Sequence, residues 1–201
     1  MRIKQFGEEP AGATPLTEED YVGLKPKWIA NRDDLNLAEA QNISEAFDKY
    51  FKSPRRTEEI LDDLFVRKLH TEMYSNVWAW AGTYRTVETS IGVAPQRISE
   101  DVKVLMENAK YWFDTSNPTE IDEAVCKVHH KLVQIHPFRN GNGRMTRMFA
   151  DLLLAANGRR VFSWGGGILD VVSPTREAYI QALRAADLGD LSLLHEFVRA
   201  T

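Results

Sequence analysis

The chain has 201 residues, of which 43% are hydrophobic and 27% are charged, a composition typical of one folded domain with a substantial core. The formal net charge of -4 gives no electrostatic indication of nucleic-acid binding. No apolar run approaches the roughly 20 residues of a membrane span, and acids stand where a signal peptide would be apolar. The one cysteine, Cys126, indicates a reducing compartment. We therefore expect a cytoplasmic protein without nucleic-acid or membrane partners.

The N-terminal quarter predicts an arm followed by a helix. Residues 1–16 lack periodicity and predict a loose arm, and Thr17 followed by Asp20 predicts the start of a short helix. Apolar residues then recur at helical spacing through residues 35–50, which predicts a helix that Pro54 terminates.

The next segment combines an amphipathic helix with a break in helical periodicity. From Thr57 the sequence predicts one helix with a single apolar face, made of Ile60, Leu61, Leu64, Phe65 and Leu69. Residues 78–99 are rich in threonine, valine and isoleucine and contain glycines, which fits one short β-hairpin or an extended excursion.

The second half returns to helices. Residues 100–114 predict one helix, and a second should run to Ile135 with Asn117 as its cap, Pro118 at its first position and Glu120 as the reciprocal partner.

Two further helical regions complete the chain. A helix from Gly143 should end at Asn157 and Gly158, and residues 175–200 predict the final helical region. The sequence around Cys126 is helical, so we interpret this cysteine as a core residue. The domain is therefore expected to be mainly α-helical.

The stretch HPFRNGNGRMTR, residues 136–147, lies between two predicted helices. A helix start presents N–H donors and partial positive charge, and Gly141 and Gly143 let the main chain approach an oxyanion. Arg144 and Arg147 share one helical face and could reach two oxygens of a longer anion. The pattern favours a di- or triphosphate site, although such loops also occur as ordinary connections.

His136 directly precedes this loop. The unperturbed pKa of histidine lies near 6.5, so the side chain could accept a proton from an attacking hydroxyl. Alternatively, His136 and Pro137 only end a helix while Phe138 fills the core. A metal site shared with His129 and His130 is not favoured, because adjacent residues on a helix point about 100° apart.

The stretch resembles the signature of the Fic family, His-x-Phe-x-(Asp/Glu)-Gly-Asn-Gly-Arg-x-x-Arg, with one departure at Asn140. The segment LHTEMYSNVWAWAGTYRTV is similar to the residues before the family's flap, and REAYIQALRAADLGDLSLLHEFV is similar to its closing helices. LNLAEAQNI together with the motif most resembles the subgroup called mobile mystery protein B.

This resemblance implies an all-α fold, a Fic-type helical bundle with one short β-hairpin flap. Residues 1–54 would form an N-terminal arm and helical extension, and residues 55–201 the core domain. It also implies that AMP is transferred from ATP, with Mg²⁺, to a Ser, Thr or Tyr hydroxyl of a target protein.

The family's residue roles carry over by position. His136 would be the general base, and Phe138 would anchor the loop. The implied phosphate-binding residues are Gly141, Asn142, Gly143, Arg144 and Arg147. The flap, which in the family pairs its main chain with that of the target, would comprise Thr86, Val87, Glu88, Thr89, Ser90, Ile91 and Gly92.

Asn140 is the departure that concerns the metal. The family has an acid there that holds Mg²⁺, whereas asparagine offers one neutral oxygen, which predicts a weak metal site. Three interpretations therefore stay open: a slower transferase, a transferase that uses the metal differently, and a nucleotide-binding interaction module with little turnover. Another donor or direction, such as phosphate transfer or removal of AMP, is open too.

Many members of the family are restrained by a helix with the pattern Ser/Thr-x-x-x-Glu-Gly/Asn, whose glutamate pairs with the arginine at the position of Arg147. Ser173 and Glu177 have the right spacing, but alanine follows, and we interpret them as a helix start. Glu39 and Glu45 lie in the N-terminal helix without the surrounding motif. This favours a separate antitoxin-like partner over a built-in inhibitor.

Overall fold

The computed structural model describes residues 18–115, 117, 120–167, 169 and 173–201, and the expected arm at residues 1–16 lies outside them. Its α-helices are α1 (Glu18–Val22), α2 (Arg32–Lys52), α3 (Thr57–Ile60), α4 (Asp63–Tyr74), α5 (Ile98–Thr115), α6 (Ile121–Ile135), α7 (Asn142–Ala156), α8 (Pro174–Asp187) and α9 (Ser192–Arg199). Two short 3₁₀ helices are Pro95–Arg97 and Trp164–Gly166.

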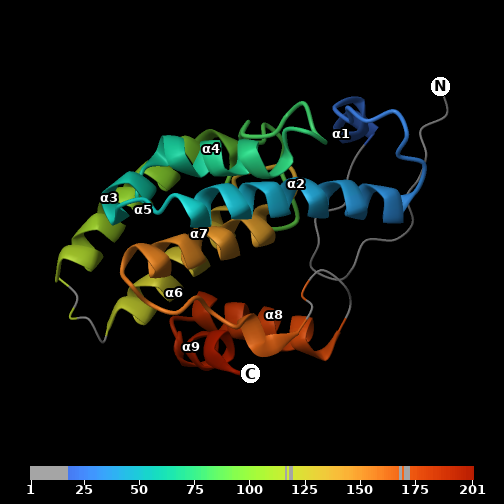
Figure 1. The fold of residues 1–201 in the computed structure, drawn as a ribbon. Helices are drawn as coiled ribbons and strands as arrows, with labels where there is room; N and C mark the ends of the chain where they lie inside the picture. Colours follow the sequence, from blue (N-terminus) through green and yellow to red (C-terminus); the bar gives the residue numbers. More distant parts are fainter. Residues whose placement is uncertain (1–17, 116, 118–119, 168, 170–172) are drawn as a thin grey trace.

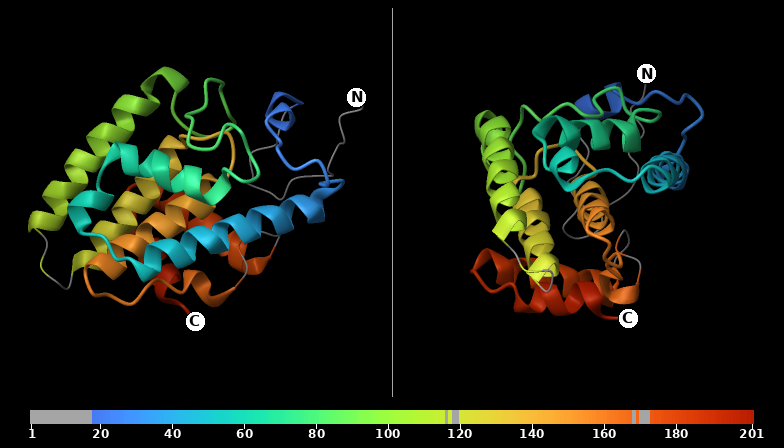
Figure 2. Two further views of the ribbon diagram at one scale, coloured as in Figure 1. Left: turned by 45° about the horizontal axis from the view of Figure 1, so that its top comes forward. Right: turned by 60° about the vertical axis from the view of Figure 1, so that its left-hand side comes forward.

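The helices pack as a bundle around α6 and α7. These two helices lie side by side, α5 covers α6, and α2 packs along α4 and reaches α7 (Figure 1). Helices α8 and α9 pack on each other and cross one end of the bundle, as Figure 2 shows in its right-hand view. The all-α expectation is therefore confirmed.

Helix α7 is central because its apolar residues extend around most of its surface. Met145, Phe149 and Leu153 recur at helical spacing and are fully buried, and Leu154 is buried beside them. Full burial of such side chains contributes about 1.5–3 kcal/mol each. The helix that begins at the glycine-rich loop is thus held firmly, and so is the loop's C-terminal end.

The helix predicted from Thr57 is in fact two helices. Helix α3 ends at Ile60, and α4 begins after Asp62, whose side chain accepts hydrogen bonds from the N–H groups of Leu64 and Phe65. Asp62 is therefore an N-cap, a role that aspartate fills well. Leu64 was expected on the apolar face but is 65% exposed, because the break changes the helical phase.

No strand ladder forms in residues 78–99, all of which the structure describes. Residues 79–94 run as turns, bends and irregular chain, residues 95–99 are helical, and an isolated β-bridge joins Trp78 to Leu24. The β-hairpin implied by the resemblance is thus not formed as paired strands, and the alternative of an excursion from helical structure applies to residues 79–94.

Several predicted helix ends are confirmed. Gly158 follows Asn157 with a left-handed φ of 65°, and the Ser173 side chain accepts from the N–H of Arg176 at the start of α8. The main-chain N–H of Asn117 donates to Glu120, but α6 begins at Ile121 with Glu120 as its N-cap and not Asn117; Pro118 lies outside the described residues. The final helical region is divided between α8 and α9.

Cys126 is a buried free cysteine, as predicted. Burial raises the pKa of its thiol to about 12, so it is a core residue and not a nucleophile.

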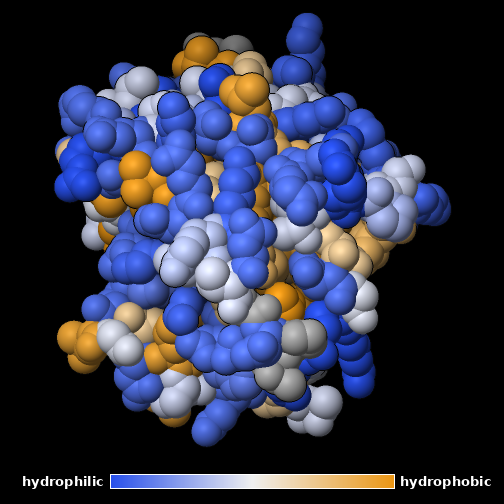
Figure 3. Space-filling view, turned by 90° about the vertical axis from the view of Figure 1, so that its left-hand side faces the viewer, coloured by the Kyte–Doolittle hydropathy of each residue, from blue (hydrophilic) through white to orange (hydrophobic). Residues whose placement is uncertain are grey.

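The surface shown in Figure 3 is mostly hydrophilic, with hydrophobic side chains in several separate places. Among the described residues, none of the helices combines the length and apolar character needed to cross a bilayer.

Candidate active site

One cleft brings together the residues singled out by the sequence motif. It has a volume of about 1170 Å³ and is lined by parts of α2, α7 and α8, the end of α6 and the end of the predicted flap. That volume exceeds the roughly 300–1,000 Å³ of common small-molecule sites. Its lining includes Gly92, His136, Gly141, Gly143, Arg144 and Arg147. The cleft can therefore hold a nucleotide together with part of a second molecule.

His136 ends helix α6 in a left-handed conformation, with φ 53° and ψ 60°. Its main-chain N–H donates to the carbonyl of Leu132 at 3.1 Å, which closes the last helical turn. The side chain is largely buried, and burial together with the positive charge of Arg85 lowers the pKa of His136 to about 4. The imidazole is therefore neutral at pH 7 and able to accept a proton.

The loop after His136 is fixed by the side chain of Asn142. Its amide oxygen accepts from the N–H of Phe138 at 2.9 Å, and its amide nitrogen donates to the carbonyl of Phe138 at 2.8 Å. Phe138 is fully buried and anchors the loop, as expected. Since the Asn142 side chain is engaged within the loop, its contribution to an anion would come from its main-chain N–H at the start of α7.

The two glycines of the loop have different reasons to be glycine. Gly141 has φ 79°, and a Cβ atom there would lie 2.5 Å from the ring of Tyr74, so only glycine fits. Gly143 lies inside α7, and its Cβ would meet the Arg147 guanidinium at an ordinary 3.5 Å. Gly141 thus uses the freedom of glycine to adopt a positive φ, whereas Gly143 does not, because the helix has already begun there.

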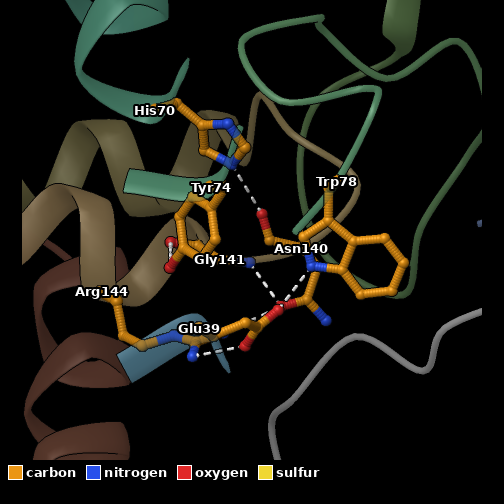
Figure 4. A network of polar contacts seen from close by, with 7 residues as sticks. All are labelled: Glu39, His70, Tyr74, Trp78, Asn140, Gly141 and Arg144. Carbon is orange, nitrogen blue, oxygen red and sulfur yellow. Dashed lines mark hydrogen bonds and ion pairs between the residues drawn. The ribbon is translucent and has the colours of Figure 1, made fainter. Parts of the chain in front are cut away.

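His70 supports the loop from α4. Its Nδ1 accepts from the N–H of Gly82 at 2.9 Å, so its Nε2 carries the proton and donates to the carbonyl of Asn140 at 3.0 Å (Figure 4). The ring stacks on Phe138 with centroids 3.8 Å apart. Burial lowers the pKa of His70 to about 3, so this neutral tautomer persists at physiological pH. The sequence offered no local pattern that pointed to this role.

Arg144 forms an ion pair with Glu39, a residue of α2 far away in the sequence. The Nη1–Oε2 distance is 2.7 Å, and the other carboxylate oxygen of Glu39 accepts from the indole N–H of Trp78 at 2.6 Å (Figure 4). Glu39 is buried, and Arg144 also lies over the Tyr74 ring at 5.3 Å. Phosphate oxygens that bind Arg144 would have to compete with this carboxylate.

The side chains around Asn140 do not fit a magnesium ion held by the protein. The Asn140 Oδ1 accepts from the N–H of Gly141 at 2.6 Å and from Arg144 at 3.3 Å. A cation at this oxygen would lie next to the guanidinium and would displace both donors. Glu39 offers a carboxylate, but it is engaged by Arg144 and Trp78. Within the described part of the chain, no group of three or more metal-binding side chains is assembled.

Arg147 lines the cleft one helical turn after Arg144, as expected from the spacing. Asp151 follows one turn later and accepts from the indole N–H of Trp164 at 3.1 Å. Burial raises the pKa of Asp151 to about 6, although hydrogen bonds from Trp164 and from the N–H of Phe162 and the nearby charge of Arg147 act in the opposite direction. The cleft therefore continues from the positive helix start into an aromatic and weakly acidic part.

Arg139, within the motif, forms an ion pair with Asp20 of α1 at 2.9 Å. The Asp20 carboxylate is buried, and the indole N–H of Trp80 donates to the Asp20 carbonyl at 3.2 Å. Arg139 therefore connects the N-terminal helix to the loop.

The predicted flap residues lie on the surface beside the cleft. Thr86, Val87, Glu88, Ser90, Ile91 and Gly92 are exposed, whereas Thr89 is half-buried. The Thr89 hydroxyl donates to the carbonyl of Ile91 at 2.6 Å. Ile91 and Gly92 also line the cleft, so the segment lies within reach of a second molecule that enters it.

The fold and the loop together define a class of protein. Its members are helical and carry a histidine at the end of one helix, followed by a glycine-rich loop that begins the next helix. The sequence matches the profile described as the Fic/DOC family over residues 15–154. The chain therefore belongs to the Fic/DOC family.

Individual relatives support this assignment. The protein adenylyltransferase fic-1 of Caenorhabditis elegans is 32% identical over 119 residues, which cover 55% of this chain and 21% of that protein. The probable protein adenylyltransferase Fic of Escherichia coli (strain K12) is 26% identical over 183 residues, 85% of this chain and 86% of that protein. The chain thus spans about a fifth of the length of its C. elegans relative.

A solved structure shows the same fold. BepC, a Bartonella effector protein from Bartonella tribocorum with bound AMPPNP, aligns with a TM-score of 0.68. The alignment has 18% identity and covers 88% of this chain and 90% of that one. These comparisons establish the family, and none of them names a subgroup.

Proposed function

We propose that this protein transfers AMP from ATP to a hydroxyl of a target protein. The observation that carries the proposal is that a neutral, buried His136 and the start of α7, with Arg144 and Arg147, line one cleft. The names of the C. elegans and E. coli relatives, both protein adenylyltransferases, support it. So does the AMPPNP bound to BepC.

In the proposed step, the oxygen of the target hydroxyl attacks the α-phosphorus. A new P–O bond forms, the bond to the β-phosphate oxygen breaks, and pyrophosphate leaves. The hydroxyl proton moves to the neutral imidazole of His136. Donors at the start of α7, with Arg144 and Arg147, stabilise the charge on the phosphates. Phosphates near His136 also raise its pKa from about 4, which strengthens the base.

Magnesium enters this proposal as part of the Mg·ATP substrate, held by phosphates and water. Asn140 was the expected metal position, but its oxygen already accepts two hydrogen bonds. An aspartate at this position would add the charge that the amide lacks. We therefore expect Asn140→Asp to increase transfer if a weak metal interaction limits the reaction.

The target would dock on the exposed segment Thr86–Gly92. This segment lies along the cleft without strand partners of its own. An incoming extended peptide could pair with its main chain, as in β-augmentation. Such pairing would bring a target side chain to His136, since the same segment ends at the cleft.

Other parts of the proposal rest on the sequence. A cytoplasmic location fits the free Cys126, and membership of the mobile mystery protein B subgroup rests on the motifs alone. A separate antitoxin-like inhibitor remains our proposal, as does the division into an extension (residues 1–54) and a core (residues 55–201).

A nucleotide-binding interaction module is a second candidate, favoured by one observation. Glu39 already forms an ion pair with Arg144, and the neutral side chain of Asn140 offers no negative charge to a metal ion. The missing negative charge at position 140 opposes turnover more than it opposes binding of a nucleotide, whereas Glu39 competes with the phosphates for Arg144. The two candidates differ in whether label moves from ATP to protein.

The test is transfer of label from α-³²P-ATP to protein, with purified chain, Mg²⁺ and cell lysate. Wild type, His136→Ala and Asn140→Asp would be compared, with His195→Ala as the control for an exposed histidine of α9. A parallel reaction with γ-³²P-ATP detects phosphate transfer, and chase with unlabelled pyrophosphate or buffer detects removal of AMP.

We expect α-label on a target band, a loss of about 100-fold or more with His136→Ala, and no change with His195→Ala. Label in wild type that persists in His136→Ala would exclude His136 as the base. Binding of ATP without label in any variant would favour the interaction module.

A further inference from the structure

Arg85 is an almost fully buried arginine at the base of the predicted flap, 1% exposed. Its guanidinium donates to main-chain carbonyls on both sides of the flap and at the end of α6. The Nε group donates to the His136 carbonyl at 2.7 Å, and Nη1 donates to the Val87 carbonyl at 2.8 Å. Nη2 donates to the carbonyls of Val93 and Ile135. One side chain therefore joins three segments of backbone.

This arrangement requires the shape of arginine. A guanidinium has five N–H donors in a rigid planar fork, whereas a lysine has three donors on one nitrogen. The carbonyls of Val87 and His136 lie on different segments, so one ammonium group could not satisfy them in the same geometry. Buried carbonyls that lose their donor are costly. The fork therefore holds the flap base at a defined distance from α6.

Arg85 also supports the unusual backbone of His136. A left-handed conformation is disfavoured for any residue with a Cβ and persists only where the surroundings enforce it. The Arg85 side chain binds the His136 carbonyl, and the Arg85 main-chain N–H donates to the carbonyl of Pro137 at 2.9 Å. These two bonds lie on consecutive residues, so they fix the direction in which the imidazole leaves the chain.

The C-terminal end of the flap packs against the same two residues. A Cβ atom on Gly92 would lie 2.6 Å from Arg85 Nη2 and 2.8 Å from the Cβ of His136. The N–H of Val93 donates to the Ile135 carbonyl at 3.3 Å. The flap and the histidine thus share one anchor and cannot move independently.

We propose that Arg85 is a positioning residue that fixes the flap to His136, so that a hydroxyl docked on the flap meets the imidazole. This inference rests on the proposed transferase function. Arg85 is not among the described residues that line the cleft, so it acts through the flap and His136 and not on the nucleotide. Removing it should therefore impair transfer while ATP binding persists.

The test compares Arg85→Lys, Arg85→Gln and Gly92→Ala. Lysine keeps the charge and loses the fork, glutamine loses both, and alanine at 92 disturbs the packing while Arg85 stays. Arg97→Gln is the control, because Arg97 is exposed and pairs with Asp101 on the surface. For each variant we would measure the melting temperature, the Kd for ATP, and kcat and KM for transfer to the target.

We expect kcat to fall about 10- to 100-fold in all three variants, as for a misplaced reacting group. The Kd for ATP should change less than about 3-fold, and Arg97→Gln should behave as wild type. Wild-type kcat in Arg85→Lys would overturn the proposal, because charge alone would then suffice. Parallel loss of folding, ATP binding and transfer would also overturn it, since Arg85 would then be merely structural.

A second readout keeps the inference separate from the proposed function. If wild type transfers no AMP, Arg85 is judged by NMR on Arg85→Lys and Arg85→Gln. Amide exchange at Val93 should accelerate in both variants, because the flap base loses its anchor. The His136 imidazole should titrate at higher pH in Arg85→Gln alone, while the cleft charges of Arg144, Arg147 and Asp151 are unchanged. Wild-type exchange and titration in Arg85→Gln would overturn the proposal.

Discussion

The glycine-rich loop and the flap face the same cleft but are built in opposite ways. Every residue from 136 to 147 is buried or half-buried, and the loop is bonded to α4 through His70 and to α2 through the pair of Arg144 with Glu39. Thr86–Gly92, in contrast, is exposed apart from Thr89 and forms no strand ladder. The loop's shape is set in advance, whereas the flap lies exposed beside the cleft, where we propose that a target docks.

This difference fits two tasks that the proposed AMP transfer requires. Groups that stabilise developing charge are most effective when they need not reorganise during the reaction, and the loop meets this condition. A docking edge that must accept an extended peptide benefits from free main-chain groups. Arg85 joins the two regions, since it bonds Val87 on one side and His136 on the other.

Lowering the pH should have the largest effect on the free energy of unfolding, because the buried imidazoles lie at the loop and in the core. Burial lowers the pKa values of His70 and His129 to about 3 and that of His136 to about 4. Below pH 6.5 the unfolded chain binds protons that the folded chain does not, so the free energy of unfolding falls as pH decreases. The raised pKa of Asp151, about 6, acts in the opposite direction.

At pH 5 we expect about 5 kcal/mol less stability than at pH 7.5, from about 2 kcal/mol for each histidine less about 1 kcal/mol for Asp151. Urea unfolding at the two pH values measures this. The variant His70→Gln cannot be protonated and should show about 2 kcal/mol less dependence. An unchanged dependence in that variant would mean that His70 is not the neutral bridge described.

A methyl group at Gly141 should disturb the loop by the next largest amount. Gly141→Ala adds a Cβ that collides with Tyr74 at a left-handed φ, so we expect a loss of about 3 kcal/mol. Gly158→Ala is a matched control, because Gly158 has φ 65° with open space around it and should lose about 1 kcal/mol. Denaturant midpoints compare the two. Equal losses of stability in the two variants would show that the Tyr74 ring can move aside at little energetic cost.

Removing the negative charge of Glu39 should increase the loop's affinity for phosphate. In Glu39→Gln the indole of Trp78 keeps an acceptor while Arg144 loses its ion pair. We expect ATP to bind about 10-fold more tightly, since a nearby charge that opposes the phosphates is gone. Calorimetry would measure the Kd, with Glu45→Gln of the same helix as the control. Weaker binding would mean that Glu39 chiefly holds Arg144 in place.

The flap should show the smallest effect on stability. Val87→Ala and Ile91→Ala truncate side chains that are 42% and 46% exposed, so the free energy of unfolding should change by about 0.5 kcal/mol or less. Labelling of the target should nevertheless decrease. Val104→Ala, equally exposed on α5, should change neither quantity. A large loss of stability in the flap variants would show that the flap is part of the core.

The predictable part of the site was local in sequence. The motif places His136 at a helix end, which is confirmed, and a helix start at Gly143, whereas α7 already begins at Asn142 with Gly141 as its N-cap. Hydrophobic periodicity also predicted the helices, but it missed the break at Asp62, because an N-cap inside an apolar repeat changes the helical phase without removing it.

The supports of the site were not predictable in the same way. His70, Arg85 and Glu39 reach the loop from other elements, and each uses a single polar side chain without a surrounding motif. Their partners are main-chain carbonyls or a residue far along the chain, which periodicity does not encode. Threonine, valine and isoleucine favour extended chain, which is why the sequence suggested a hairpin. The carbonyls of Val87 and Val93 instead accept hydrogen bonds from Arg85 and do not pair with a neighbouring strand.

The ion pair of Asp20 with Arg139 has a consequence for biosynthesis. These residues are separated by 119 positions, and Glu39 and Arg144 by 105. Contacts of such sequence separation form late, because long loops must close first. A nascent chain that has not yet emerged past α7 therefore has no assembled loop. Helices α1 and α2 are therefore synthesised well before their partners in the loop, and these two ion pairs can form only after α7 has been made.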